Sequence, residues 1–241
     1  MIDGDGRAMR VTVLELPARW DGAAEALADV DERLGRGPAT DLVLLPEAAL
    51  TGYVSPAGDF DVTALAEAVD GATARGLAAL AARHGVHLIG PLIERDGDDC
   101  FNSMIGFGPD GARVVHYRKR HPWLPETWAT PGARPYPVVR IGDVEVMIAT
   151  CYDLHFLPAD GADALAAADL LLFPSAWVDR QRTRVPLLRA LAARFDVAIA
   201  NANWAPGVVR VAGQGGSCIV AANGDVIATA PIGGRADAIL G

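Results

Sequence analysis

Residues 144–157 read VEVMIATCYDLHFL, and this stretch decides how the chain is interpreted. Val144–Ala149 is an apolar run typical of a buried strand, and it leads directly to Cys151. Ligands of α/β proteins bind outside the carboxyl ends of the strands, so a thiol at this place is a candidate nucleophile. Backbone N–H groups and the start of a helix nearby would favour its thiolate. Cysteine is also among the most buried residue types, and on this stretch alone structural packing explains Cys151 equally well.

Apolar strands and amphipathic helices alternate on both sides of this stretch. Before it we expect strands at 10–16, 41–45 and 86–93, helices at 23–34 and 72–84, and a hairpin of 101–107 with 113–118. Around and after it we expect a hairpin of 138–141 with 144–149, helices at 159–168 and 183–195, strands at 170–173 and 197–200, a hairpin of 218–222 with 226–230, and a strand at 238–240. The pattern predicts an α/β fold of two mixed sheets flanked by helices, in a single domain over 9–241. Residues 1–8 are expected to form a flexible N-terminal extension.

Composition narrows the possible partners and compartment. The net charge of −9 disfavours a nucleic acid or an anionic membrane as partner. The three cysteines, Cys100, Cys151 and Cys218, form no CxxC pair, so neither a metal site nor a disulfide framework is indicated. No apolar run reaches the ~18 residues of a membrane span, and the N-terminus is unlike a signal peptide. We therefore expect a cytoplasmic protein.

Three chemically different side chains follow apolar runs at strand ends: Glu47, Lys119 and Cys151. Together they could carry out acyl transfer. The thiol would attack a carbonyl carbon, and the carboxylate would take its proton and pass one to the leaving amine. The ammonium, with the backbone N–H of Tyr152, would stabilise the oxyanion. Taken singly, Glu47 could instead cap the next segment, and Lys119 could lie in a solvated basic strip with Arg118 and Arg120.

The stretches around these residues resemble the nitrilase superfamily, the carbon–nitrogen hydrolases. They are DLVLLPEAALTGY around Glu47, GARVVHYRKRHPW around Lys119 and IATCYDLHFLP around Cys151. The resemblance covers nearly the whole chain from about Met9. It implies a nitrilase-like α-β-β-α sandwich, no cofactor, no metal, and a Glu47–Lys119–Cys151 catalytic triad.

The resemblance also points to further site residues. Glu126 matches a second glutamate that family members often carry after the lysine, although it could be an exposed loop acid. Tyr53 and Trp177 match positions of pocket residues, with simple packing as the alternative. Cys-Tyr-Asp is similar to the amidase-like branch, whereas true nitrilases usually have Cys-Trp-Glu. The branch commonly has arginine where this chain has His155, which puts a carboxylate-bearing substrate in doubt. His155 could offer a weaker, pH-dependent contact, or form a dyad with Cys151.

The function expected is hydrolysis of a non-peptide amide bond in a small carboxamide through a cysteine thioester, releasing ammonia or an amine. One alternative is hydrolysis of an N-carbamoyl amine, which would also release carbon dioxide. An alternative of another class is a non-catalytic binding or regulatory relative on the same scaffold. The resemblance further implies a homodimer or higher homo-oligomer that pairs through the helices expected at 159–168 and 183–195.

Overall fold

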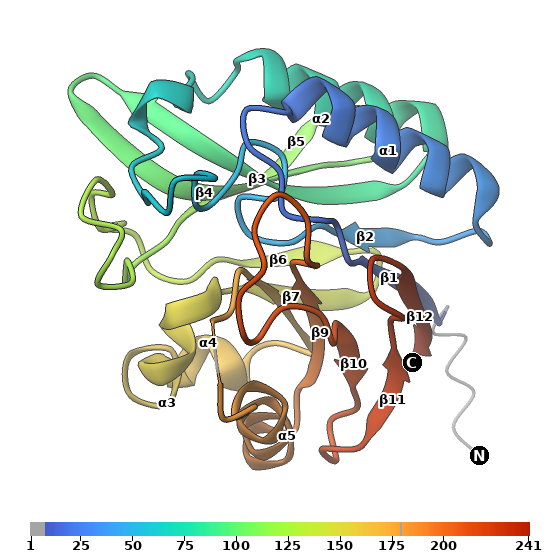
Figure 1. Ribbon diagram of the computed structural model, residues 1–241. Coiled ribbons are helices and arrows are strands. Elements are labelled where there is room, and N and C mark those ends of the chain that lie inside the picture. The colour runs from blue at the N-terminus through green and yellow to red at the C-terminus, as the bar shows by residue number, and fades with distance from the viewer. Residues whose placement is uncertain (1–7, 179) are drawn as a thin grey trace, which may run out of the picture.

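The computed structural model describes residues 8–178 and 180–241, and these form two six-stranded mixed sheets that lie face to face (Figure 1). The extension expected at 1–8 lies outside the described residues except for Ala8. Helices cover the outer faces: α1 and α2 lie over the first sheet, and α3, α4 and α5 over the second. This is the α-β-β-α sandwich that the sequence predicted.

The elements follow one another in two series. The first contains β1 (Met9–Leu14), α1 (Ala23–Arg36), β2 (Leu42–Leu44), the 3₁₀ helix η1 (Thr63–Leu65), α2 (Ala72–His84), β3 (His87–Asp96), β4 (Asp99–Phe107) and β5 (Arg113–Arg118). The second contains β6 (Val138–Ile141), β7 (Val144–Ile148), the 3₁₀ helix η2 (Cys151–His155), α3 (Leu157–Asp160), α4 (Ala162–Ala166), β8 (Leu170–Ser175), α5 (Arg184–Phe195), β9 (Ala198–Asn203), β10 (Cys218–Val220), β11 (Val226–Thr229) and β12 (Arg235–Leu240).

The strand directions place the carboxyl ends of β2 and β5 on the same side of the first sheet. Its order is β12-β1-β2-β3-β4-β5, with β1, β2 and β3 parallel. Two antiparallel pairings, β3 with β4 and β4 with β5, return β5 to the direction of β2. The second sheet has the order β11-β10-β9-β8-β7-β6, with β7, β8 and β9 parallel. Residues that follow β2 and β5 therefore come together although they are far apart in sequence.

The pleat of β2 explains how one strand serves two cores. Leu42 and Leu44 belong to the core between the two sheets, whereas Val43 and Leu45 pack toward the helices with Leu77 of α2. Successive side chains of a strand point to opposite faces, so a strand buried on both faces needs a continuous apolar run. The run DLVLL has that pattern, and the three residues of β2 and Leu45 after it are all fully buried.

Two local features differ from the sequence-based expectations. The single helix expected at 159–168 is wrong: the chain forms the short helices α3 and α4, which meet at Gly161. A side chain there would meet Leu157 at 2.8 Å and Tyr136 at 3.2 Å, so the bend brings the backbone close to its neighbours. The strand expected at 86–93 contains Pro91, yet β3 runs from His87 to Asp96. Pairing with β2 ends at Ile89, so on that side no strand needs the N–H that proline lacks.

Among the described residues no helix is long and apolar enough to span a membrane.

The core between the sheets predicts a clear difference between two truncations. Leu171 of β8 is fully buried in it, whereas Ile232 is largely exposed. We expect Leu171→Ala to lower the free energy of unfolding by about 2–5 kcal/mol, because it removes apolar contacts and leaves a cavity. Ile232→Ala is the control and should change it by about 0.5 kcal/mol or less. Urea unfolding measures both, and equal losses would contradict the assignment of this core.

Candidate active site

The edge where β2 and β5 end carries Glu47 and Lys119, and Cys151 follows β7 of the facing sheet. All three are buried, with Glu47 and Lys119 each 1% exposed and Cys151 6% exposed. The thiol interacts electrostatically with Glu47 and with Lys119. The structure thus brings together the three strand-end residues singled out in the sequence. Their catalytic roles remain predictions.

Lys119 forms a buried ion pair with two carboxylates. Its Nζ lies 2.7 Å from Oε1 of Glu47 and 2.7 Å from Oε2 of Glu126. Lys119 therefore does not lie in a solvated basic strip. Glu126 is 2% exposed, so it is not an exposed loop acid either. Charges taken out of water are stable only when they are paired and hydrogen-bonded, and this arrangement meets both conditions for Lys119.

The two carboxylates also accept hydrogen bonds from donors in three other segments. Nδ2 of Asn102 in β4 donates to Oε1 of both glutamates, at 2.8 Å each. The backbone N–H of Ala176 donates to Oε2 of Glu47 at 2.8 Å. The backbone N–H of Trp123 donates to Oε2 of Glu126 at 2.6 Å. Glu47 therefore does not cap the segment that follows it, because its carboxylate is turned to this network.

Asn102 was not singled out as a site residue in the sequence analysis. The signal available was an amide side chain in FNSMIGF, a stretch otherwise typical of a buried strand. A polar group in such a place must find partners, because burying it unpaired costs free energy. Its partners could not be named before the strand pairing was known.

Cys151 has a left-handed backbone conformation with φ of +47°. Such a conformation costs a non-glycine residue roughly 1–3 kcal/mol, and it persists only where the surroundings impose it. The fully buried Asp153 provides that constraint. Its carboxylate accepts hydrogen bonds from the N–H of Thr150 at 2.9 Å, the N–H of His121 at 2.9 Å and the hydroxyl of Tyr117 at 2.6 Å. Asp153 thereby ties the turn that carries the thiol to β5 and the loop after it.

The charges around the thiol set its protonation. Burial raises the pKa of Cys151, and the Glu47 carboxylate raises it further, while Lys119 acts in the opposite direction. The net effect favours the thiol over the thiolate, although nearby N–H groups were expected to favour the thiolate. As a nucleophile, such a thiol would need a base, and Glu47 is the neighbouring carboxylate that could accept its proton.

The two carboxylates also determine the charge of the lysine. Burial alone would lower the pKa of Lys119, but Glu47 and Glu126 outweigh it and raise the pKa above its ordinary value. Burial raises the pKa of Glu126, and Lys119 opposes this. Lys119 is accordingly an ammonium throughout the neutral range. It supplies a fixed positive charge beside the thiol.

A small cavity of about 80 Å³ opens beside Cys151. It is lined by Tyr53, Trp123, Cys151, Tyr152, His155, Ala176, Trp177 and Val178. All four residues predicted to bind substrate are in this set, although their contact with a substrate stays a prediction. By the same measure one water needs roughly 10–15 Å³, so the cavity holds a group of several heavy atoms. Cavities for drug-sized ligands are larger, at about 300–1,000 Å³.

Aromatic rings form the walls of this cavity. Tyr53 stacks on Trp123 with centroids 6.4 Å apart, and Trp177 lies 5.7 Å from the His155 ring. The hydroxyl of Tyr53 and Nε1 of Trp177 are buried and have no hydrogen-bond partner among the described residues. Burial and the neighbouring carboxylate of Glu126 raise the pKa of Tyr53, so its hydroxyl stays protonated and can donate. Tyr53 and Trp177 therefore both pack against neighbouring rings and line the cavity.

Over residues 8–178 and 180–241, no group of three or more His, Cys, Asp or Glu side chains is arranged to hold a metal ion.

The effect of Glu47 on the thiol can be measured directly. Glu47→Gln removes the negative charge that disfavours the thiolate while Lys119 remains, so the pKa of Cys151 should fall. The ultraviolet absorbance of the thiolate, titrated with pH, gives this value, and subtraction of the Cys151→Ala titration assigns the signal. Glu25→Gln, which neutralises an exposed acid of α1, is the control and should leave the titration unchanged. A pKa that stays the same or rises in Glu47→Gln would contradict this description of the site.

Comparison with known proteins places this site in a family. The sequence matches the carbon-nitrogen hydrolase family over residues 8–235. A hydrolase in the pqqF 5' region of Pseudomonas protegens is 30% identical over 228 residues, which are 93% of this chain and 79% of that protein. An omega-amidase of Danio rerio is 27% identical over 181 residues, which are 70% of this chain and 63% of that protein.

A solved amidase structure from Nesterenkonia sp. superposes with a TM-score of 0.86 at 25% identity. The match covers 100% of this chain and 93% of that one. That structure is of a variant in which the acetamide moiety of fluoroacetamide is covalently added at the active-site cysteine. With its buried Glu47, Lys119 and Cys151, the chain belongs to the carbon-nitrogen hydrolase family within the nitrilase superfamily, and it is a hydrolase of carbon–nitrogen bonds other than peptide bonds.

Proposed function

We propose that the protein hydrolyses the amide bond of a small carboxamide through a thioester on Cys151. The observation that carries this proposal is the buried set of a thiol, a carboxylate and an ammonium at the carboxyl ends of three strands. The thiol has a carboxylate partner in Glu47, and the cation, Lys119, is fixed by two ion pairs.

In the first half of the reaction, Sγ of Cys151 attacks the carbonyl carbon of the amide while Glu47 accepts the thiol proton. The carbonyl oxygen becomes an oxyanion, which the ammonium of Lys119 and the N–H of Tyr152 stabilise. The tetrahedral intermediate collapses when Glu47 returns the proton to the nitrogen. The carbon–nitrogen bond breaks, ammonia or an amine leaves, and the acyl group remains on sulfur as a thioester.

In the second half, water takes the place of the departed amine. Glu47 accepts a proton from the water as its oxygen attacks the thioester carbon. The carbon–sulfur bond then breaks, and Glu47 gives the proton to the leaving thiolate, so that Cys151 is a thiol again. The product is a carboxylic acid. One carboxylate thus serves as base and acid in both halves, as microscopic reversibility requires.

Glu126 and Asn102 would act through their neighbours. Glu126 holds Nζ of Lys119 together with Glu47, and Asn102 links the two carboxylates. Both keep the ammonium and the base in place before substrate arrives. Preorganised charge of this kind contributes to catalysis because it need not reorient during the reaction.

The cavity beside Cys151 indicates a small acyl group. Its volume of about 80 Å³ and its aromatic walls suit a short, mainly apolar acyl chain. The similarity to an omega-amidase and to an amidase that accepts an acetamide moiety at its cysteine supports a carboxamide as substrate. No feature of the site favours an N-carbamoyl amine, and the intact triad gives no support to a non-catalytic role.

Removal of the thiol tests the proposed reaction. Cys151→Ala should lower the release of ammonia from short aliphatic amides by at least about a thousandfold, because no thioester can form. Cys218→Ala removes another buried free thiol and is the matched control, with activity close to that of the wild type. An acyl adduct on Cys151 in the intact mass of the wild-type protein would support the thioester, and carbon dioxide as a co-product would indicate the carbamoyl alternative. Ammonia release by Cys151→Ala at the wild-type rate would refute the mechanism.

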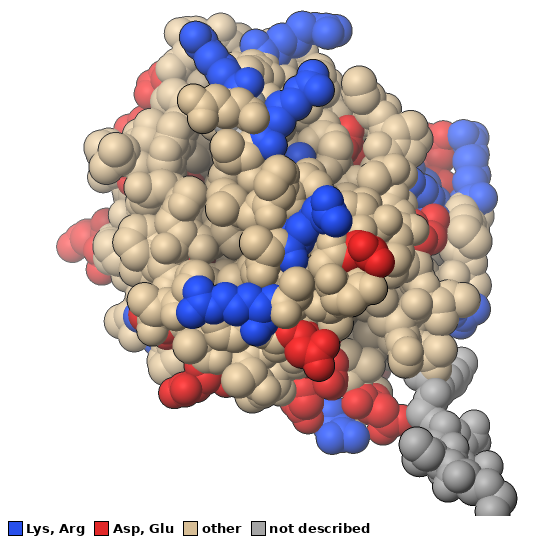
Figure 2. All heavy atoms as spheres, turned by 90° about the horizontal axis from the view of Figure 1, so that it is seen from below, with Lys and Arg blue, Asp and Glu red and all other residues tan. Residues whose placement is uncertain are grey.

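We also propose that two copies of the chain associate through the face formed by α3, α4 and α5. Figure 2 shows this face, seen from below in the view of Figure 1, as mainly uncharged with scattered basic and acidic side chains. Leu187 on α5 is 39% exposed there, as expected for an apolar position that a partner could cover.

The oligomeric state tests the proposed pairing. Light scattering at micromolar concentration should give the mass of a dimer or a larger oligomer for the wild type. Leu187→Glu places a charge in the proposed interface and should shift the mass toward the monomer, whereas Ile239→Glu on β12 is the exposed control. A monomeric wild type would contradict the proposal.

A further inference from the structure

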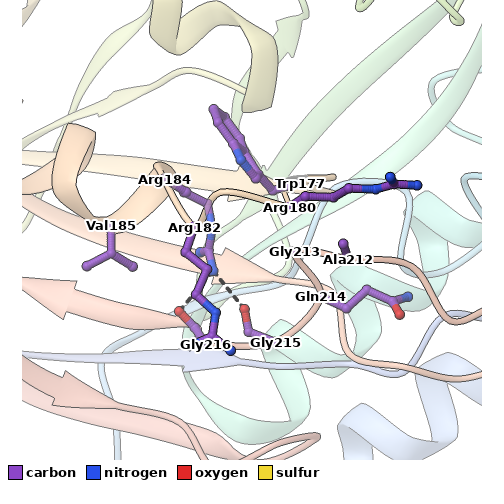
Figure 3. Close-up of a pocket in the computed structure, with 10 residues that line it drawn as sticks. All are labelled: Trp177, Arg180, Arg182, Arg184, Val185, Ala212, Gly213, Gln214, Gly215 and Gly216. Atoms are coloured by element: carbon purple, nitrogen blue, oxygen red, sulfur yellow. Dashed lines mark hydrogen bonds between the residues drawn. The ribbon is translucent and has the colours of Figure 1, made fainter.

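A second, larger cavity lies next to the one beside Cys151, and Trp177 lines both (Figure 3). Its volume is about 490 Å³. It is bounded by Arg180, Arg182 and Arg184, which precede or begin α5, and by the glycine-rich segment 212–216. In Figure 3 the side chain of Arg180 extends over this segment on the side of Gln214. The reaction proposed above makes no use of this cavity.

The floor of the cavity is a fixed structure. Nη2 of the buried Arg184 donates to the carbonyl oxygens of Gly215 at 2.7 Å and Gly216 at 3.1 Å. Nδ2 of Asn203 in β9 donates to the carbonyl oxygens of Gly213 and Gly215, at 2.8 Å each. Gly215 and Gly216 have φ of +80° and +69°, which favours glycine at both positions. The glycine-rich segment is therefore held against the sheet at a defined distance from the arginines.

The lining of the cavity is basic. Arg180 and Arg182 form no ion pair with any described residue, although the chain has 30 acidic residues against 21 basic ones. The described residues that line the cavity include no aspartate or glutamate. A guanidinium group offers several N–H donors in a planar fork that matches a carboxylate or phosphate group. Two such groups at one cavity favour an anionic ligand.

Trp177 provides an independent sign that a ligand binds here. Its side chain is 8% exposed, and its Nε1 has no hydrogen-bond partner among the described residues. A buried indole N–H is usually paired, because leaving it unpaired costs free energy. An acceptor atom on a ligand that passes along Trp177 would satisfy this donor.

We propose that the second cavity binds an anionic group at the far end of the substrate, with Arg180 and Arg182 as its specificity-determining residues. This inference rests on the proposed amide hydrolysis, because it places the amide carbon at Cys151 and the acyl chain along Trp177. The substrate class is then a short amide whose acyl chain ends in a carboxylate or a phosphate-like group. Each guanidinium contributes charge-assisted hydrogen bonds to that group without touching the reacting atoms.

Matched substrate pairs test this specificity. The probes are succinamate, its neutral methyl ester and 3-phosphonopropanamide, each assayed by ammonia release. We expect the wild type to have a kcat/KM for at least one anionic amide that is about tenfold or more above that for the neutral ester. In the double variant Arg180→Gln/Arg182→Gln, this preference should fall by about tenfold or more, mainly through KM, while the neutral ester changes by about twofold or less. Arg113→Gln, at an exposed position of β5 far from the cavity, is the control and should keep the preference.

A binding measurement separates this inference from the proposed reaction. Cys151→Ala cannot form the thioester, and calorimetry on this variant measures the affinity for succinamate and the phosphonate without turnover. Weaker binding of both anions when Arg180→Gln/Arg182→Gln is added supports the subsite. The anion that binds more tightly shows whether the subsite prefers a carboxylate or a phosphonate group. The inference is overturned if the wild type hydrolyses the neutral ester as well as the anions, or if the arginine variants lose activity on all three amides equally. Failure of all three amides to react, with anion binding intact, would instead count against the proposed function alone.

Discussion

The buried ammonium of Lys119, held between the carboxylates of Glu47 and Glu126, is the interaction on which the site depends. Each of the two contacts is 2.7 Å long, and all three side chains are removed from solvent. Breaking a buried ion pair by removing one partner typically costs about 3–5 kcal/mol, because the other charge stays buried without compensation. The pairing therefore constrains three segments at once: the end of β2, the end of β5 and the loop that carries Glu126.

In the proposed mechanism, this constraint lets the thiol remain protonated and still react. Glu47 has one oxygen directed to Lys119 and the other to the N–H of Ala176, and it also raises the pKa of Cys151. The carboxylate that disfavours the thiolate is therefore the group positioned to receive its proton. Lys119 gains no proton and loses none. In that mechanism its charge would be available for the oxyanion at each step.

The sequence predicted the parts of the site that depend on single strands. Polar residues after the buried runs DLVLL and VEVMIA indicated strand ends, and the bounds expected for α2 agree with the structure. Features that depend on contacts between distant segments could not be predicted. Asn102 bridges two carboxylates because β4 pairs with β5, and Asp153 fixes the Cys151 turn through Tyr117 of the other sheet and the loop after it. The basic cavity near Trp177 arises from two loops whose conformations no pattern determines.

The central claim, that the buried ammonium of Lys119 stabilises two buried carboxylates, is tested by the pH dependence of unfolding of Lys119→Met. Without the ammonium, burial favours the protonated form of these carboxyl groups in the folded state, so the folded protein binds more protons than the unfolded chain. The loss of stability relative to wild type should then be small at about pH 4 and grow as the pH rises to about 8. Adding Glu47→Gln and Glu126→Gln should remove most of the loss at about pH 8. A loss that is equal at both pH values, and that the glutamine substitutions leave unchanged, would contradict the claim.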